Sequence, residues 1–257
     1  VVVEKAGGIE KKRSEFMQPA HNRSINYQAT RSKTVQQNVK SNNLGKIVSP
    51  LAKEAVLLKD EQPVKAAIQY LCERSKILNG DVNLATQLAD WLKDKMAGRW
   101  KLCYRATDDG WKGQDFHRKC NDAGPTVTLV KCGIGVFGGY TDQSWKPNPF
   151  FGMGKKHSET SFLFSLRNKG NIPPFKCPIY DNQENCAIWC DSSHGATFGG
   201  GYDLFISDNA NRNKESYSNL GDTYQPPPGY QHGTLGAKSL LAGREKFTPT
   251  EIEVFSN

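Results

Sequence analysis

Short strand-like runs separated by turn residues are the feature that most constrains how this chain can fold. From Trp100 to the end, apolar and β-branched residues occur in brief runs, with Gly, Asn, Asp and Pro clustered between them. Trp100, Leu102 and Tyr104 alternate along the first run. The later runs cover residues 126–131, 136–140, 162–166, 187–189, 202–207 and 251–255. Many short strands with only brief helices predict an α+β, mainly β fold, a two-sheet antiparallel β-sandwich.

Residues 44–99 predict a helical extension in front of the sandwich. A Ser-Pro pair at 49–50 is typical of a helix start, and a second start follows at 60–63, where acidic residues precede a proline. The second helix should end at Asn79-Gly80, and a third should run from about Asn83 to Gly98. The apolar face of each of these helices should be buried against another part of the protein. We expect them to pack on the sandwich through Leu71, Leu88 and Trp91.

Residues 1–43 are a polar, basic arm that carries most of the net positive charge of the chain. The arm holds eight Lys or Arg against three Glu, whereas residues 100–257 hold seventeen basic against sixteen acidic residues. Such a segment is expected to be a flexible tail or an arm lying on the domain. Its cationic side chains are candidates for binding a nucleic acid or an anionic surface. They are Lys11, Lys12, Arg13, Arg23, Arg31, Lys33 and Lys40.

The seven cysteines predict at least one disulfide, with Cys177, Cys186 and Cys190 as the candidates because they lie in the most cysteine-dense stretch. We expect Cys103, on a strand among apolar neighbours, to be a buried free thiol. Cys186 and Cys190 lack a partner pair at zinc-finger spacing, so we expect no metal site. Asn22 begins a glycosylation sequon, and the chain opens on three valines without an initiator Met. Together these features favour a secreted, processed protein over a cytosolic one.

Five polar residues are the candidates if the domain has an active site, namely Arg105, His117, His194, Asp203 and Asp208. Catalysis needs a nucleophile, a base and a stabilising group within hydrogen-bond reach, which a sequence does not show. The favoured interpretation is structural: Asp203 and Asp208 shape turns around a strand, and Arg105 pairs with a carboxylate across the sandwich.

Three further patterns point away from a cofactor, a hydrolase or a membrane span. The glycines at 138–139 and 199–201 lack the Lys-Ser/Thr of a phosphate loop and fit bulges, positive φ or close sheet approach instead. The segment 192–194 lacks the G-x-S-x-G elbow of a hydrolase. No run approaches the ~18 apolar residues of a membrane span. We therefore predict no cofactor and no integral membrane segment, and the residues favour a binding protein over an enzyme.

Ten segments in the second part of the chain agree in order and spacing with one known domain. They are residues 100–111, 115–120, 124–129, 136–141, 144–145, 161–166, 195–209, 216–221, 240–243 and 247–255. On these motifs residues 100–257 resemble a TLDc domain, the domain of oxidation-resistance proteins, and the preceding helices resemble the extension of some metazoan members. The resemblance implies a two-sheet antiparallel sandwich and no agreed catalytic residues.

Three functions stay open at this point. The first is a non-enzymatic binding or protective protein, secreted, with a defence, matrix or cell-surface role. The second is a secreted cytotoxic effector that binds nucleic acid or membranes through the basic arm. The third, implied by the resemblance, is an intracellular oxidative-stress protein that binds the vacuolar proton ATPase.

Overall fold

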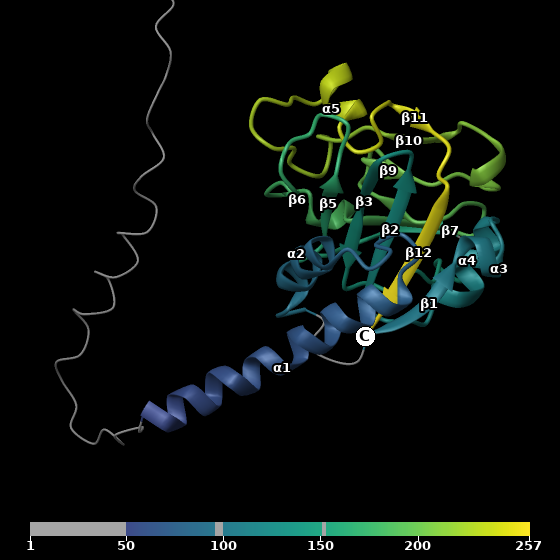
Figure 1. Ribbon diagram of the computed structural model, residues 1–257. Helices are drawn as coiled ribbons and strands as arrows, with labels where there is room; N and C mark the ends of the chain where they lie inside the picture. The colour runs from purple at the N-terminus through teal and green to yellow at the C-terminus, as the bar shows by residue number, and fades with distance from the viewer. Residues whose placement is uncertain (1–49, 96–99, 151–152) are drawn as a thin grey trace, which may run out of the picture. The chain divides into compact units, whose positions relative to one another are not determined.

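A computed structural model of the chain describes residues 50–95, 100–150 and 153–257 (Figure 1). The basic arm lies outside the described residues, and with it Asn22 and the seven cationic candidates from Lys11 to Lys40. What is described forms one compact unit, from Pro50 to Asn257.

Two antiparallel sheets of six strands each make up the body of this unit. The first sheet contains, in spatial order, β1 (Lys101–Arg105), β12 (Glu251–Ser256), β2 (Thr126–Cys132), β3 (Gly135–Thr141), β5 (Phe162–Arg167) and β6 (Phe175–Pro178). The second contains β11 (Lys246–Phe247), β10 (Ser216–Ser218), β9 (Leu204–Phe205), β8 (Thr197–Phe198), β7 (Ile188–Asp191) and β4 (Met153–Lys156). The predicted mainly β, two-sheet antiparallel fold is confirmed.

The helices are few, and most are short. They are α1 (Pro50–Arg74), α2 (Val82–Leu92), α3 (Ala106–Asp109), α4 (Gly113–Cys120) and α5 (Leu235–Ser239), with 3-10 turns η1 (Glu184–Cys186) and η2 (Ala210–Arg212). The prediction of two helices that meet near Pro63 is wrong, because α1 continues through that residue. A proline inside a helix removes one backbone N–H donor and costs about 3 kcal/mol, which is why the sequence pattern favoured a helix start there. The expected stop signal, Asn79-Gly80, lies in the turn after α1, where both residues have positive φ.

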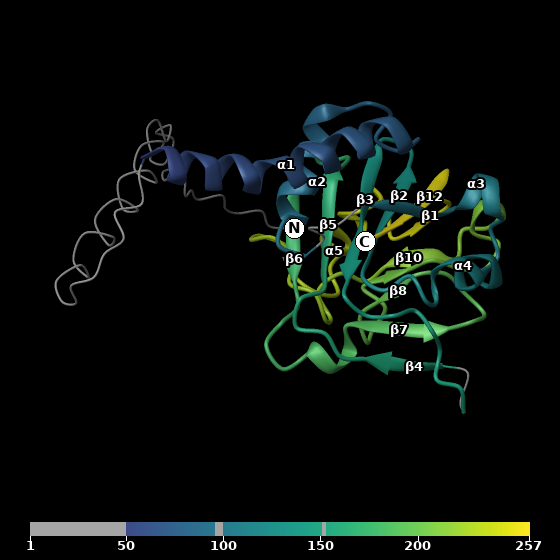
Figure 2. The ribbon, with the colours of Figure 1, turned by 90° about the horizontal axis from the view of Figure 1, so that it is seen from below.

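The outer face of the first sheet is covered by α1 and α2 (Figure 2). Leu71 and Leu88 are fully buried in this layer, and the Trp91 ring lies 6.0 Å from that of Phe164 on β5, centroid to centroid. Burying each leucine stabilises the fold by roughly 1.5–3 kcal/mol. The predicted packing through Leu71, Leu88 and Trp91 is therefore confirmed.

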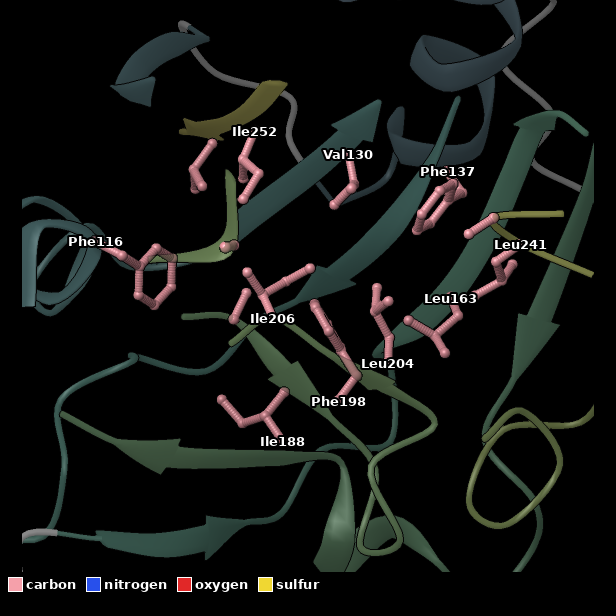
Figure 3. Close-up of a cluster of buried hydrophobic side chains, with 14 of the residues drawn as sticks. Phe116, Val130, Phe137, Leu163, Ile188, Phe198, Leu204, Ile206, Leu241 and Ile252 are labelled. Atoms are coloured by element: carbon pink, nitrogen blue, oxygen red, sulfur yellow. The ribbon is translucent and has the colours of Figure 1, made fainter. Parts of the chain in front are cut away.

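A second apolar layer fills the space between the two sheets (Figure 3). Phe137 and Leu163 of the first sheet face Phe198 and Leu204 of the second. Gly139 on β3 makes this close approach possible, since a Cβ there would lie 2.6 Å from the ring of Phe198. The outer face of the first sheet is thus covered by α1 and α2, whereas the outer face of the second sheet is not covered by these helices.

Candidate binding surface

Arg105 belongs to a buried network that joins the end of α1 to the sandwich. Its Nε lies 2.8 Å from Oε1 of Glu253, whose side chain is fully buried on β12. Glu253 also accepts hydrogen bonds from the Ser75 hydroxyl and from the backbone N–H of Lys76. The expected pairing of Arg105 with a carboxylate is present, but it does not cross the sandwich, because β1 and β12 are neighbours in one sheet. This network holds the turn between α1 and α2 in place.

Asp203 organises the turn that follows β10. Its carboxylate is fully buried and accepts backbone N–H groups from residues 221 to 224. Burial raises the pKa of Asp203 to about 6, although these hydrogen bonds favour the ionised form. Gly199 has a φ of +89°, and a Cβ there would lie 2.1 Å from Asp203 Oδ2. The glycine run therefore makes room for this carboxylate.

His117, His194 and Asp208 meet around α4. Asp208 Oδ1 accepts the backbone N–H of Gly113 at 2.8 Å, and a Cβ on Gly113 would lie 2.5 Å from the backbone nitrogen of His194. His117 Nε2 lies 2.8 Å from the carbonyl oxygen of Asp191. These contacts fasten the 191–195 turn to α4.

The chemistry that this corner offers is limited by the partners of its side chains. Burial lowers the pKa of His194, so its ring is neutral at pH 7. Its Nδ1 lies 3.1 Å from Oγ1 of the buried Thr197. The Ser193 hydroxyl donates to Asp191 and not to a histidine. Within the described residues no group of three or more His, Cys, Asp or Glu side chains is placed to hold a metal ion.

Four aromatic side chains form a continuous line on the outer face of the second sheet. They are Trp189 of β7, Tyr202 of the turn between β8 and β9, Phe205 of β9 and Tyr217 of β10, and we call them the aromatic row. Successive ring centroids lie 6.0, 5.6 and 5.1 Å apart, and each residue is partly exposed. Their strand neighbours Ile188, Leu204 and Ser216 are buried on the opposite side of the sheet. The row is therefore a surface feature and not part of the core.

Tyr202 has a backbone conformation that is unusual for a bulky side chain. Its φ is +60°, in the left-handed region, where a non-glycine residue costs roughly 1–3 kcal/mol. The ring stacks on Phe205 with an interplanar angle of 19°. This backbone conformation places the ring between Trp189 and Phe205 and closes the row.

Lysines border the row at both ends. Lys155 of β4 lies opposite Trp189 in the strand register, and Lys246 of β11 lies opposite Tyr217. Both lysines are exposed. A groove of about 380 Å³ adjoins the Lys155 end. It is lined by Ser144, Lys146, Pro147, Asn148, Pro149, Gly154, Lys155 and Lys156. The surface is thus apolar in the middle and basic at its ends.

None of the candidate site residues predicted from the sequence belongs to the aromatic row. The available signal was that Trp189 and Phe205 alternate with residues that face the core, so their rings had to face outward on a strand. Tyr202 gave no such signal, because its position depends on a turn conformation that favours glycine.

The cysteines lie differently from the prediction. All seven are free thiols in the structure, so the predicted disulfide among Cys177, Cys186 and Cys190 is not formed there. Cys177 lies on β6 of the first sheet and Cys190 on β7 of the second. Cys103 is a free thiol, as predicted, but the prediction that it is buried is wrong, since this residue is partly exposed.

Among the described residues no helix is both long enough and apolar enough to cross a membrane. No curated protein matches the chain. The TLDc domain model, by contrast, matches residues 71–257, which begin within α1 and include α2 and both sheets. This family is related to oxidative stress. With most of its length matched and the expected two-sheet sandwich present, the chain belongs to the TLDc domain family.

Proposed function

We propose that this chain is a non-enzymatic TLDc binding protein with a protective role, and that it docks onto a protein partner through the aromatic row. The observation that carries the proposal is the line of four touching, partly exposed rings on a sheet face. Trp and Tyr side chains provide most of the binding energy in many protein interfaces. The left-handed backbone at Tyr202 adds support, because such conformations concentrate at functional sites.

The lysines at the ends define the chemistry of the partner. The aromatic row would pack against apolar side chains of the partner. Lys155 and Lys246, at the two ends of the row, would pair with carboxylates of the partner. The groove beside Lys155 contains two more lysines, which suits a partner with an acidic segment at that end. We therefore expect an apolar partner surface bordered by Asp or Glu.

The contacts of the polar candidates support a binding role over catalysis. Arg105 is occupied by Glu253, and Asp203 by the backbone of a turn. His117 contacts a backbone carbonyl oxygen, and Asp208 accepts a backbone N–H. Each contact holds an element of the fold in place.

The experiment compares a row variant with an exposed apolar residue away from the row and its groove. Wild type, Tyr217→Ser and the control Ile134→Ser, whose parent side chain is 62% exposed between β2 and β3, are used as bait in an extract of the source tissue. Bound proteins are identified and purified, and their affinities are measured directly. We expect Tyr217→Ser to raise Kd at least tenfold, about 1.4 kcal/mol, and Ile134→Ser to leave it unchanged. Equal affinity for wild type and the row variant would rule out the aromatic row as the docking surface.

The vacuolar proton ATPase is a second candidate partner, which the resemblance to intracellular TLDc proteins suggests. Binding of the purified ATPase to wild type and Tyr217→Ser tests it. If neither protein binds, this candidate is rejected.

Secretion, with a defence, matrix or cell-surface role, is supported by the sequon at Asn22. Intact mass before and after reduction and deglycosylation distinguishes the two compartments. A glycan and a disulfide in the native protein would favour secretion, whereas seven free thiols and no glycan would favour the intracellular role.

A further inference from the structure

Two thiols from separate elements meet at one side of the sandwich. The Sγ of Cys103 on β1 lies 4.0 Å from the Sγ of Cys120, the last residue of α4. Seventeen positions separate them in the sequence. Among the cysteines of the described residues, this pair brings two Sγ atoms to hydrogen-bond range.

A β-bulge directs Cys103 toward its neighbour. Leu102 pairs with Phe255 and Tyr104 with Val254, which leaves Cys103 without a partner in the β1–β12 register. Bulges bend a strand and re-aim the side chain of the extra residue. The Cys103 thiol also lies 3.2 Å from the carbonyl oxygen of Val254, so its position is held from both sides.

The two thiols differ in access and in acidity. Cys103 is partly exposed, whereas Cys120 is fully buried. The hydrogen bond from Cys120 lowers the pKa of Cys103, against the effect of burial, and the charge of Lys101 acts in the same direction. Burial raises the pKa of Cys120. Of the two, Cys103 therefore has the properties of an attacking thiolate and Cys120 those of a resolving thiol.

We propose that Cys103 and Cys120 form a reversible disulfide when the protein is exposed to hydrogen peroxide. The Cys103 thiolate attacks one peroxide oxygen, the O–O bond breaks, and hydroxide leaves with a proton from solvent as water. Cys103 is then a sulfenic acid. The Cys120 sulfur attacks it, the S–O bond breaks, and a second water leaves with the Cys120 proton. Two thiols are oxidised by two electrons and one peroxide is reduced to two waters. A cellular dithiol reverses the reaction by exchange.

The geometry requires only a small movement. A disulfide has an S–S length of about 2.05 Å, so the sulfurs approach by about 2 Å. The bond joins β1 to α4, the helix that holds the 191–195 turn through His117. Oxidation should therefore stiffen the corner next to the aromatic row.

Peptide mapping of the whole protein tests the assignment. The protein is treated with hydrogen peroxide, alkylated without reduction and digested with trypsin. We expect the tryptic peptides 102–105 and 120–131 to appear as one linked species and to separate after dithiothreitol. The intact mass should fall by two hydrogen atoms. The melting temperature of the oxidised protein should rise by several degrees, because the link closes a loop in the unfolded chain.

Variants identify the order of events and provide the controls. Cys132→Ser removes a partly buried thiol elsewhere and should leave the link unchanged. Cys103→Ser should abolish it. In Cys120→Ser, dimedone should trap a sulfenic acid on residue 103. If Cys120→Ser does not fold, the wild-type map and Cys103→Ser still decide the matter. A peroxide-treated protein that keeps both thiols free, or that links Cys103 to a different cysteine, would refute the proposal.

Discussion

Tyr202 shows how one residue combines a backbone cost with a surface role. A side chain at φ +60° is disfavoured, yet the ring completes the line between Trp189 and Phe205. Ring stacking of this kind contributes roughly 0.5–1.5 kcal/mol, which offsets part of the backbone strain. Substitutions at this position can therefore separate the free-energy cost of the backbone conformation from the contribution of the ring.

We predict that Tyr202→Gly is more stable than Tyr202→Ala by about 1 kcal/mol in the free energy of unfolding. Both variants lose the ring, but glycine adopts a positive φ without steric cost. Urea denaturation of the two variants measures the difference. Equal stabilities would mean that the backbone relaxes out of the left-handed region once the ring is removed.

Asp203 makes the stability of the fold depend on pH. Its folded pKa, about 6, lies above the ordinary value of 3.8, so the folded state binds the proton more tightly than the unfolded chain does. This contribution is fully present below about pH 3.8 and is lost as the pH rises through about 6.

We therefore expect Asp203 to weaken the fold as the pH rises from about 4 to about 6. The measurement is urea unfolding across that range for wild type and Asp203→Asn, together with a carboxyl titration by NMR. The part of the pH dependence of the unfolding free energy that arises from Asp203 should be absent in Asp203→Asn. A titration midpoint below 4 would show that the four backbone N–H donors outweigh burial.

Among the elements, the helical layer depends most on a few leucines. Leu88 of α2 is fully buried against the first sheet, whereas Leu235 of α5 is 71% exposed. We predict that Leu88→Ala destabilises the protein by about 2–5 kcal/mol and that Leu235→Ala changes it by less than ~0.5 kcal/mol. Thermal or urea unfolding compares them. A small loss for Leu88→Ala would mean that α2 is not part of the cooperative unit.

The local pattern of apolar and polar residues predicted the strands in which these residues alternate strongly. It missed the strands that form only by pairing with a segment far away in the sequence. The runs at 126–131 and 251–255 became β2 and β12, because both alternate β-branched or apolar residues with polar ones and both pair with a neighbouring strand on each side. β4 reads Met-Gly-Lys-Lys and forms only by pairing with β7. The meeting of Cys103 with Cys120 depends on a bulge, which no local pattern reveals. Family motifs predicted the fold, but the aromatic row depended on knowing which side of each strand faces outward.

At the scale of the whole molecule, the net charge of +8 is concentrated in residues 1–43, outside the described residues. If this arm binds polyanions, affinity arises from counterion release and falls steeply with salt. With three to five phosphates contacted, the slope of log affinity against log salt should be roughly −3 to −4.5.

We predict that deletion of residues 1–43 removes most of this salt dependence and leaves the melting temperature little changed. A salt titration with a nucleic acid duplex and a thermal melt, on full-length and truncated protein, measure both. A marked loss of thermal stability with unchanged binding would instead show an arm that packs on the domain. If neither property changes, the arm has no part in either.

The two six-stranded sheets are open, and this has a consequence for how the protein meets other chains. Their outermost strands are β1, β6, β4 and β11, and each carries at least one lysine, namely Lys101, Lys176, Lys155, Lys156 and Lys246. An ammonium group on an edge strand discourages a foreign strand from extending the sheet, because its charge would have to be desolvated. We therefore expect these lysines to disfavour edge-to-edge polymerisation. A partner would then bind side chains on a sheet face and not the unpaired backbone of an edge strand.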